Sequence, residues 1–337
     1  MKMLTRRAAV ALGAGLPLCA GPVFGKAAIR DRSPFLMGVN LAGSEFEAIG
    51  GQWNWPDESN LRYYLSKGFD VFRVPFRWTR LQPTLNAPLD PAAMAGLDRL
   101  VEVVTQAGAT ILLDAHDYGR RGTGVIGAAN NDATIAAFAD FWGRLALRYG
   151  KQPRIWYGLM NEPHDQDAHL NLAAQNAACA AIRHHGGRGK VLFSGIAWTG
   201  AHSWIDSGNG SVMLGAVDPA DNFGFDMHQY LDEGFGGSRP DAIPGIGAKV
   251  LLPVIAWARS HSRTIFIGEF STGPSLASLR ELTDMVDVMT SHHDVFIGAT
   301  YWAGGGVWGK DNSQTIDPIG SVDKPQMAVL RHFIGKY

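Results

Sequence analysis

The chain has 337 residues, of which 46% are hydrophobic and 18% are charged, a composition typical of a folded protein with a large core. Its 30 Lys and Arg residues nearly balance 31 Asp and Glu residues, which argues against nucleic acid or an anionic membrane as a partner. The length suits one large barrel or two ordinary domains.

The first 26 residues are typical of an export signal. The doublet Arg6-Arg7, which resembles a twin-arginine signal, precedes the apolar run Ala8–Ala20, and residues 1–26 hold no acidic residue. The run is shorter than the roughly 20 residues that a spanning helix needs. Cleavage near Gly25–Ala28 leaves a net charge of about −5 and Cys179 as the only cysteine. We therefore expect a secreted or periplasmic protein without an internal disulfide.

Eight short apolar runs follow, and each gap between them has room for one helix and two loops. The runs are rich in β-branched and aromatic residues, as buried strands are. Eight strands that alternate with helices predict an α/β protein with a single (β/α)8 TIM barrel, and a doubly wound open sheet is the alternative. The runs are Phe35–Gly43, Asp70–Trp78, Thr110–Tyr118, Arg154–Pro163, Val191–Gly200, Asn222–Asp232, Thr264–Ser271 and Phe296–Gly305.

The segments between the runs carry helical periodicity. Ala92–Gln106 places its apolar residues on one face, and Thr134–Tyr149 and Ser278–Met289 do the same. Asp90 before Pro91 predicts an N-cap followed by the first helical residue. We find no internal repeat, low-complexity linker or second domain, and we therefore expect residues 27–337 to form one domain.

Each run is apolar at its start and polar near its end. In a (β/α)8 barrel the carboxyl ends of the strands meet at one mouth, where the active sites of such barrels lie. The sequence therefore predicts that these polar and aromatic side chains converge. They are Arg73, His116, Asn161, Glu162, Trp198, His228, Tyr230, Glu269 and Trp302.

Two of these residues are carboxylates at opposite sides of the predicted mouth. Glu162 ends the fourth run in Asn161-Glu162-Pro163, and Glu269 ends the seventh in Gly268-Glu269-Phe270. Each alone is more often an acidic residue at a strand end than a catalytic group. Together they fit a retaining glycosidase, whose carboxylates lie about 5–5.5 Å apart, while an inverting pair needs roughly 6.5–9.5 Å.

The chain resembles glycoside hydrolase family 5, the large cellulase family, from Gly38 to about Trp308. The stretches that carry the resemblance follow the family's order: VFRVPFRW, LLDAHDYG, LMNEPHD, AWTGAHSW, MHQYLD, IGEFS and YWAGG. The overlapping segments HDYGRRGTGVIG and WTGAHSW look most like the family's endo-β-1,4-glucanases, which act on cellulose.

This resemblance implies a role for each polar residue at the mouth. Glu162 becomes the acid/base and Glu269 the nucleophile, with Arg73 and Tyr230 keeping the nucleophile ionised. Asn161 is expected to hold the sugar 2-hydroxyl. His116 and His228 are expected to hydrogen-bond substrate hydroxyls or the two glutamates, and Trp302 is expected to form the floor of the subsite at the cleaved bond. The candidates for stacking on sugar rings are Tyr118, Trp198 and Trp204, followed by Trp53, Trp55 and Trp308, of which Trp53 and Trp55 could equally pack under the first loop.

One position departs from the family's pattern. The cellulases that the chain resembles usually have Asn-Tyr after the third-strand histidine, whereas this chain has Asp117-Tyr118 after His116. An ionised Asp only accepts hydrogen bonds, whereas Asn also donates them. A contact with substrate or with the fold is therefore in question at Asp117.

The expected substrate is a β-glucan polysaccharide or a cello-oligosaccharide. We expect the enzyme to be a monomer without a carbohydrate-binding module. Neither the LDAHD segment nor His292-His293 has the spacing of a catalytic zinc site, so we expect no metal and no organic cofactor. The alternatives are a β-mannanase, a xylanase or a mixed-linkage glucanase with the same machinery, a carbohydrate-binding barrel without catalysis, and a metal hydrolase.

Overall fold

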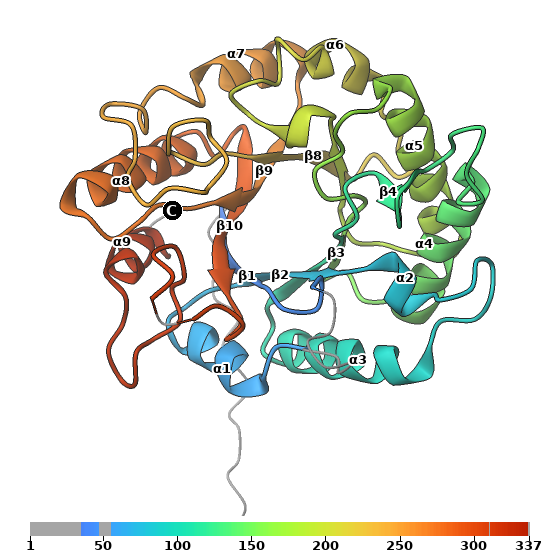
Figure 1. The fold of residues 1–337 in the computed structure, drawn as a ribbon, viewed down its shortest axis with the longest axis horizontal. Helices are drawn as coiled ribbons and strands as arrows, with labels where there is room; N and C mark the ends of the chain where they lie inside the picture. Colours follow the sequence, from blue (N-terminus) through green and yellow to red (C-terminus); the bar gives the residue numbers. More distant parts are fainter. Residues whose placement is uncertain (1–34, 47–54, 310, 336–337) are drawn as a thin grey trace, which may run out of the picture. The chain divides into compact units, whose positions relative to one another are not determined.

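Eight parallel strands close into a barrel in the order in which they follow one another along the chain. The computed structural model describes residues 35–46, 55–309 and 311–335, all within the compact unit Arg32–Tyr337. Figure 1 shows the helices in a ring outside these strands. The barrel strands are β1 (Leu36–Leu41), β2 (Val71–Phe76), β3 (Thr110–Ala115), β6 (Ile155–Gly158), β7 (Val191–Ser194), β8 (Phe223–His228), β9 (Ile265–Phe270) and β10 (Phe296–Gly304). The predicted barrel is confirmed, and the open sheet is wrong.

The periodic segments form the expected helices. The three predicted ones correspond to α3, α4 and α8, and the side chain of Asp90 accepts a hydrogen bond from the Ala93 N–H, 2.7 Å away, so the predicted cap of α3 is confirmed. The α-helices are α1 (Glu58–Ser66), α2 (Trp78–Leu81), α3 (Pro91–Gln106), α4 (Ile135–Tyr149), α5 (Ala168–His184), α6 (Asn209–Val212), α7 (Leu252–His261), α8 (Leu276–Ser291) and α9 (Pro325–Phe333).

Three kinds of short element complete the described chain. Two short antiparallel strands, β4 (Arg120–Arg121) and β5 (Gly124–Val125), pair with each other in the segment that follows β3. Two 3-10 helices, η2 (Ala197–Thr199) and η3 (Met213–Gly215), lie in the chain between β7 and β8. Within the described residues, no helix has the length and apolar character needed to cross a membrane.

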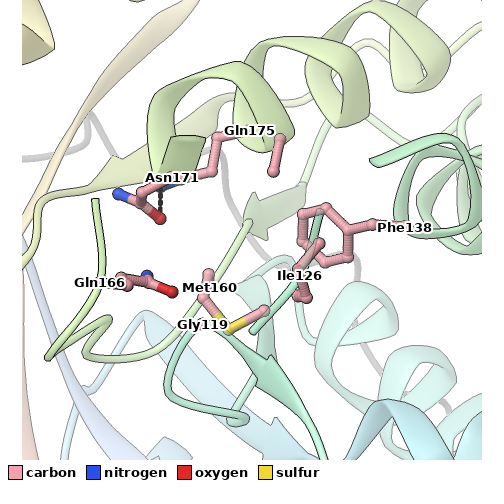
Figure 2. A pocket seen from close by; sticks show the side chains of 8 residues that line it. Gly119, Ile126, Phe138, Met160, Gln166, Asn171 and Gln175 are labelled. Carbon is pink, nitrogen blue, oxygen red and sulfur yellow. Dashed lines mark hydrogen bonds between the residues drawn. The ribbon is translucent and has the colours of Figure 1, made fainter. Parts of the chain in front are cut away.

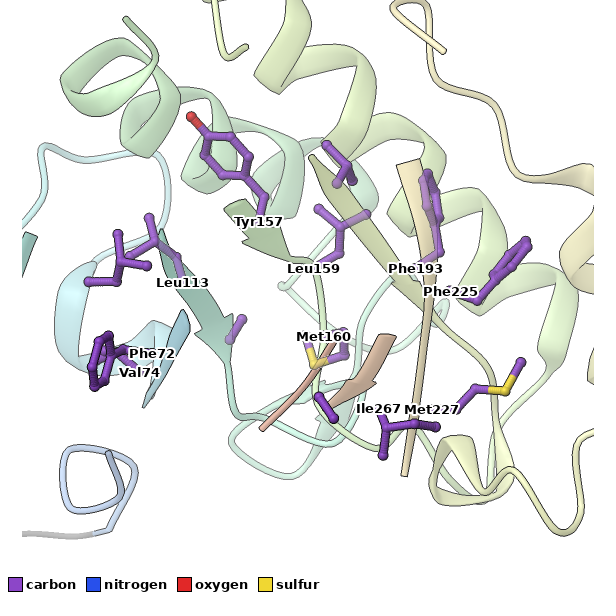
Figure 3. Close-up of a cluster of buried hydrophobic side chains, with 14 of the residues drawn as sticks. Phe72, Val74, Leu113, Tyr157, Leu159, Met160, Phe193, Phe225, Met227 and Ile267 are labelled. Atoms are coloured by element: carbon purple, nitrogen blue, oxygen red, sulfur yellow. The ribbon is translucent and has the colours of Figure 1, made fainter. Parts of the chain in front are cut away.

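Side chains that alternate between the two faces of each strand form two separate hydrophobic clusters. Side chains such as Phe72, Leu113 and Phe225 belong to the large cluster that also contains the helices' buried residues (Figure 3). The other face of the strands contributes a small cluster of Leu36, Val71, Leu112, Leu192 and Phe266. Because side chains of a barrel strand alternate between helix layer and interior, this small cluster fills the barrel interior.

The interior face changes from apolar to polar along each strand. Two residues after Val71 stands Arg73, and two and four residues after Leu112 stand Asp114 and His116. All three polar side chains are buried. A step of two residues keeps a side chain on the same face of a strand. These polar groups therefore also point into the barrel, nearer the carboxyl ends of the strands than the small apolar cluster is.

Candidate active site

Glu162 and Glu269 face each other across the mouth of the barrel. Glu269 lies within β9, and Glu162 follows β6 with a φ of 43°. A carboxylate oxygen of each residue and a ring nitrogen of His228 all lie within 4.8 Å of one another. The side chain of Glu269 is 4% exposed and that of Glu162 is 17% exposed. The more buried carboxylate therefore depends more on protein partners for its charge.

Two donors hold the carboxylate of Glu269, one on each oxygen. Arg73 Nη1 donates to Oε1 at 2.7 Å, and the Tyr230 hydroxyl donates to Oε2 at 2.6 Å. Burial by itself would raise the pKa of Glu269, but the charges of His228 and Arg73 and the Tyr230 hydrogen bond lower it below the usual 4.5. Glu269 is therefore ionised at neutral pH, as a nucleophile must be.

Glu162 experiences the opposite balance. Burial and the negative charge of Glu269 raise its pKa above the usual 4.5, although the hydrogen bond with His228 and that residue's charge oppose the rise. A carboxyl whose pKa is raised keeps its proton at higher pH and can act as a general acid. Two neighbouring carboxylates with pKa values displaced in opposite directions can divide the acid and nucleophile tasks.

His228 lies between the two carboxylates. Its Nδ1 is 2.8 Å from Glu162 Oε1 and 3.5 Å from Glu269 Oε2, and its Nε2 is 3.7 Å from Asp226 Oδ2. Burial alone would lower the pKa of His228, but the charge of Glu269 and the contacts with Asp226 and Glu162 raise it to about 10. A protonated His228 donates hydrogen bonds and has no free lone pair.

Glu162, His228 and Glu269 form the one group, within the part of the chain that the structure describes, whose ligand atoms approach closely enough for a metal ion. Metal binding would require a deprotonated His228, whereas the charge of Glu269 and the contacts with Asp226 and Glu162 favour the protonated ring. Within this group, the short contact of 2.8 Å between His228 Nδ1 and Glu162 Oε1 is a hydrogen bond.

Arg73 contacts four polar side chains, of which Glu269 is one. Besides Glu269, its Nη1 donates to Asn40 Oδ1 at 2.8 Å, its Nη2 donates to Asn161 Oδ1 at 2.7 Å, and its Nη2 lies 3.1 Å from Asp114 Oδ2. The side chain is fully buried, and carboxylates around it keep the guanidinium charged. It therefore orients Glu269 and Asn161 together.

His116 and Trp302 form one side of the site. Their rings stack with centroids 5.6 Å apart and an angle of 18° between them. His116 Nδ1 is 2.8 Å from Asp114 Oδ2, and Asn161 Nδ2 is 3.2 Å from His116 Nε2. Burial lowers the pKa of His116 well below its usual 6.5, so this ring is neutral where His228 is charged.

Tyr118 lies at the edge of the site and Asp117 does not reach it. The Tyr118 ring lies under the guanidinium of Arg77 at 5.5 Å and meets the His164 ring edge-on at 6.0 Å. Asp117 is buried, and its Oδ2 accepts the Trp78 N–H at 2.7 Å, where α2 begins. The question raised by the sequence therefore has an answer: Asp117 makes a contact within the fold.

The two tryptophans expected to stack on sugar differ in exposure. Trp198 is 51% exposed, and its ring stacks on His164 with centroids 4.7 Å apart. Trp204 is fully buried and packs against Phe225 and Trp257 at 5.7 and 5.6 Å. The prediction of Trp204 as a substrate-stacking residue is wrong, because no face of its ring reaches solvent.

The remaining aromatic candidates, Trp308 and Trp55, differ in their surroundings. Trp308 meets Trp302 edge-on at 6.4 Å and borders the site. Trp55 packs against the core, with its indole beside Gly96 of α3. Trp53 lies outside the described residues.

Two cavities lie near the site. One of about 160 Å³ opens beside Trp302 and is lined by Trp308, Asn312, Gln314, Thr315 and Gly237. The other, shown in Figure 2 between Ile126, Met160 and Gln166, has only about 10 Å³, which is room for a single water molecule. The larger cavity therefore borders the site on the side of Trp302.

Sequence reasoning missed three buried acids and one amide at the mouth: Asn40, Glu45, Asp114 and Asp226. A signal for two of them is present, since Asp-x-His occurs at both Asp114–His116 and Asp226–His228. Because two residues apart means the same face of a strand, each aspartate had to stand beneath a histidine of the mouth. Glu45 carries no such pattern; burial raises its pKa to about 7.

The sequence matches the family described as "Cellulase (glycosyl hydrolase family 5)" over residues 32–305. The endo-beta-1,4-glucanase B of Aspergillus niger is 31% identical over 304 residues, which cover 88% of this chain and 89% of that protein. The endo-beta-1,4-glucanase B of Emericella nidulans is 30% identical, with 90% and 93% covered.

Solved structures give the same answer. XacCel5A in complex with cellopentaose superposes with a TM-score of 0.85 at 34% identity, covering 88% of this chain and 98% of that one. The endoglucanase Cel5A of Pseudomonas stutzeri in complex with cellobiose superposes with a TM-score of 0.78 at 29% identity, with 89% and 92% covered. This chain therefore belongs to the cellulase family, glycosyl hydrolase family 5, and is a glycoside hydrolase.

Proposed function

We propose that the enzyme is an endo-β-1,4-glucanase that cleaves internal β-1,4-glucosidic bonds of cellulose-like glucans with retention of configuration. The observation that carries the proposal is the approach of Glu162 and Glu269 within 4.8 Å, with pKa values displaced in opposite directions. Carboxylate oxygens this close support a retaining pair, because the carboxyl groups of an inverting pair stand about 6.5–9.5 Å apart to admit a water molecule. The β-1,4-glucan substrate is supported by relatives named endo-beta-1,4-glucanases and by the cellopentaose bound to XacCel5A.

The reaction proceeds in two displacements. Glu269 attacks the anomeric carbon while Glu162 gives its proton to the glycosidic oxygen, so that the bond to the leaving sugar breaks as a glycosyl–Glu269 ester forms. Glu162, now ionised, takes a proton from a water molecule that attacks the same carbon and releases Glu269. The glucose unit at the cleaved bond keeps its β configuration after two inversions.

Neighbouring residues stabilise the charges of this sequence. Arg73 and Tyr230 hold Glu269 ionised, and the protonated His228 hydrogen-bonds Glu162, which favours the ionised form that Glu162 takes after it releases its proton. Asn161 donates to the sugar 2-hydroxyl, a contact that strengthens in the transition state. His116 supports Asn161, and Trp302 forms the apolar floor under the sugar ring.

Replacement of the nucleophile tests the assignment. Glu269→Ala should lower kcat on carboxymethylcellulose by at least about 10⁴-fold, since no other group can form the ester, while binding of cello-oligosaccharides remains measurable by calorimetry. Glu102→Ala, on the exposed surface of α3, is the matched control and should keep full activity. Hydrolysis at the wild-type rate by Glu269→Ala would refute the assignment.

The stereochemical claim has its own measurement. Proton NMR of a cello-oligosaccharide digest should show the β-anomer of the new reducing end first, before mutarotation produces the α-anomer. First appearance of the α-anomer would establish inversion and contradict the proposal.

The choice of sugar is tested by comparing substrates. Carboxymethylcellulose, barley glucan, mannan and xylan should be assayed together, and a rapid fall in the viscosity of carboxymethylcellulose relative to reducing ends released would establish endo action. Activity on mannan alone or xylan alone would assign the enzyme to another β-glycanase of the family. No activity on any of the four would favour a carbohydrate-binding barrel. A chelator should leave the activity unchanged, because two carboxylates and water suffice; inhibition would favour a metal hydrolase.

Export and assembly complete the proposal. Residues 1–26 act as a signal peptide, because they have a basic start, an apolar run and no acidic residue. Residues 27–337 form the catalytic domain. This domain acts as a monomer outside the cytoplasm. Sedimentation of the purified protein tests the monomer, and a stable dimer would contradict it.

A further inference from the structure

Asp114, His116, Asn161 and Arg73 form a closed ring of contacts beneath the proposed nucleophile. Asp114 Oδ2 lies 2.8 Å from His116 Nδ1, His116 Nε2 lies 3.2 Å from Asn161 Nδ2, Asn161 Oδ1 lies 2.7 Å from Arg73 Nη2, and Arg73 Nη2 lies 3.1 Å from Asp114 Oδ2. All four side chains are buried. Every group in the ring is therefore restrained by two others.

The ring allows only one arrangement of hydrogens. Arg73 Nη2 is a donor and never an acceptor, so the Asn161 atom in contact with it is the oxygen, and the amide nitrogen must face His116. His116 Nε2 then accepts from that nitrogen, and the neutral ring carries its hydrogen on Nδ1. Asp114 Oδ2 accepts this Nδ1–H, because a hydrogen on Oδ2 would point at either the guanidinium or the Nδ1–H.

The position of the hydrogens in the ring depends on Asp114. Without its Oδ2, His116 could move its hydrogen to Nε2, and two hydrogens would then face each other between Nε2 and Asn161 Nδ2. Asp114 Oδ1 is buried and has no hydrogen-bond partner, so the whole polar function of this carboxylate is concentrated in the oxygen that contacts His116 and Arg73. Such a costly buried group has a role that an apolar side chain could not fill.

We propose that Asp114 is a positioning residue for the reaction: by holding His116 in the Nδ1–H form, it fixes the amide of Asn161 so that one N–H bonds His116 and the other is directed at the 2-hydroxyl of the sugar at the cleaved bond. This inference rests on the proposed function of Asn161. Burial supports it, because the lowered pKa of His116 keeps the ring neutral and its Nε2 able to accept.

Kinetics on two substrates separate this role from a general structural one. Turnover of 2,4-dinitrophenyl β-cellobioside should be compared with that of its analogue lacking the 2-hydroxyl on the reacting sugar, after correction for spontaneous hydrolysis. Asp114→Ala should lower kcat/KM for the parent by about 10-fold or more but for the deoxy analogue by less than about 3-fold, since the deoxy sugar has no contact to lose. Asn161→Ala should show the same difference.

Asp114→Asn is the matched control. An amide oxygen can occupy the place of Oδ2 and accept from His116, so this variant should stay within about 3-fold of wild type on both substrates. Equal losses on both substrates for Asp114→Ala would overturn the proposal, because Asp114 would then act through Arg73 and Glu269 or through the fold.

A spectroscopic measurement tests the ring without catalysis. Nitrogen-15 shifts of the His116 ring in the wild-type enzyme should report the hydrogen on Nδ1, and in Asp114→Ala a shift of the hydrogen toward Nε2. A wild-type hydrogen on Nε2 would overturn the proposal even if the variant failed to fold. If the wild type does not hydrolyse the parent substrate, the proposed function fails, while this measurement still decides the ring.

Discussion

At Glu269, burial and hydrogen bonding act in opposite directions on one carboxylate. Its surroundings disfavour charge, yet the charges of His228 and Arg73 and the Tyr230 hydroxyl keep its pKa below 4.5. Hydrogen bonds that are in place before a reaction cost no reorganisation during it. In the proposed mechanism, the same contacts that ionise Glu269 also hold it in position to attack. The pKa of this residue is therefore sensitive to each donor.

Tyr230→Phe isolates one donor. Loss of the hydroxyl removes a hydrogen bond that favours the charged form, so the pKa of Glu269 should rise, and the acidic limb of the kcat/KM profile should move to higher pH. We also expect kcat/KM at the pH optimum to fall by about 10-fold or more. Tyr157→Phe, whose buried hydroxyl has no hydrogen-bond partner, is the control and should leave the profile unchanged. An acidic limb that does not move would contradict this account of Glu269.

Two tryptophans of the same loop region should respond differently to replacement. Trp198→Ala removes an exposed ring, so the KM for cello-oligosaccharides should rise several-fold at unchanged stability. Trp204→Ala removes a fully buried ring and should lower the free energy of unfolding by about 3–5 kcal/mol. Urea denaturation and steady-state kinetics measure both effects. A stable Trp204→Ala variant with a raised KM would restore this residue to the substrate site.

Among the elements, the end of α5 shows how the opposite face of the barrel is held together. Arg183 in the last turn of α5 donates to both carboxylate oxygens of Asp218, at 2.8 and 2.7 Å, and Asp218 also accepts the N–H groups of Ala220 and Asn222. The two side chains are 7% and 0% exposed. Arg183 precedes β7 and Asp218 precedes β8, so the pair lies toward the amino ends of these strands, away from the carboxyl ends that form the mouth.

Asp218→Ala should therefore affect stability and not catalysis. It leaves the guanidinium of Arg183 without its carboxylate partner, while three backbone carbonyls still accept hydrogen bonds from it. We expect a cost of about 3 kcal/mol in the free energy of unfolding at neutral pH. Hydrogen bonds from Arg183 and the backbone, which outweigh burial, lower the pKa of Asp218 below 3.8, so this contribution is present above pH 3.8 and is lost as the pH falls through the folded-state pKa.

The exposed pair Arg259–Asp294 provides the comparison. It has the same bidentate geometry, but its side chains are 49% and 54% exposed, so Asp294→Ala should have a much smaller effect. Urea denaturation at neutral and acidic pH measures both variants. Equal losses in the two variants, or a loss for Asp218→Ala that persists below its pKa, would contradict the assignment.

Elements were predicted from sequence with more success than their ends. The runs at β6 and β7 are ten residues long, but only Ile155–Gly158 and Val191–Ser194 pair as strands. The rest of each run leaves the barrel: Asn161 bonds back to β3, and Trp198 lies in η2 with φ of 55°. Apolar and aromatic composition does not distinguish a paired strand residue from a residue of the loop that follows it, because both kinds of segment contain such side chains.

For the whole molecule, the export signal remains a prediction with a direct measurement. If residues 1–26 are cleaved, N-terminal sequencing of the enzyme recovered outside the cytoplasm should begin within Gly25–Ala28, and the mature net charge should be about −5. Replacement of Arg6-Arg7 by two lysines should block export if the twin-arginine route is used. Mature protein that begins at Met1 would exclude cleavage.

The sequence alone determined the barrel and its strand order, and it predicted that Glu162 and Glu269 meet at the mouth. Eight apolar runs with helical segments between them permit few other folds, and polar residues at the ends of parallel strands must share one mouth. These properties follow from local patterns, because strand periodicity and the length of each connection can be read from short stretches of sequence.

Only the tertiary structure decided which tryptophan is buried, what Asp117 contacts, and how Asp114 and Asp226 support the two histidines. It also brought Glu162 and Glu269 within 4.8 Å of each other and assigned opposite pKa displacements to two chemically identical side chains. Burial and electrostatic interaction depend on groups that are distant in sequence, so a carboxylate's protonation state cannot be obtained from its own segment.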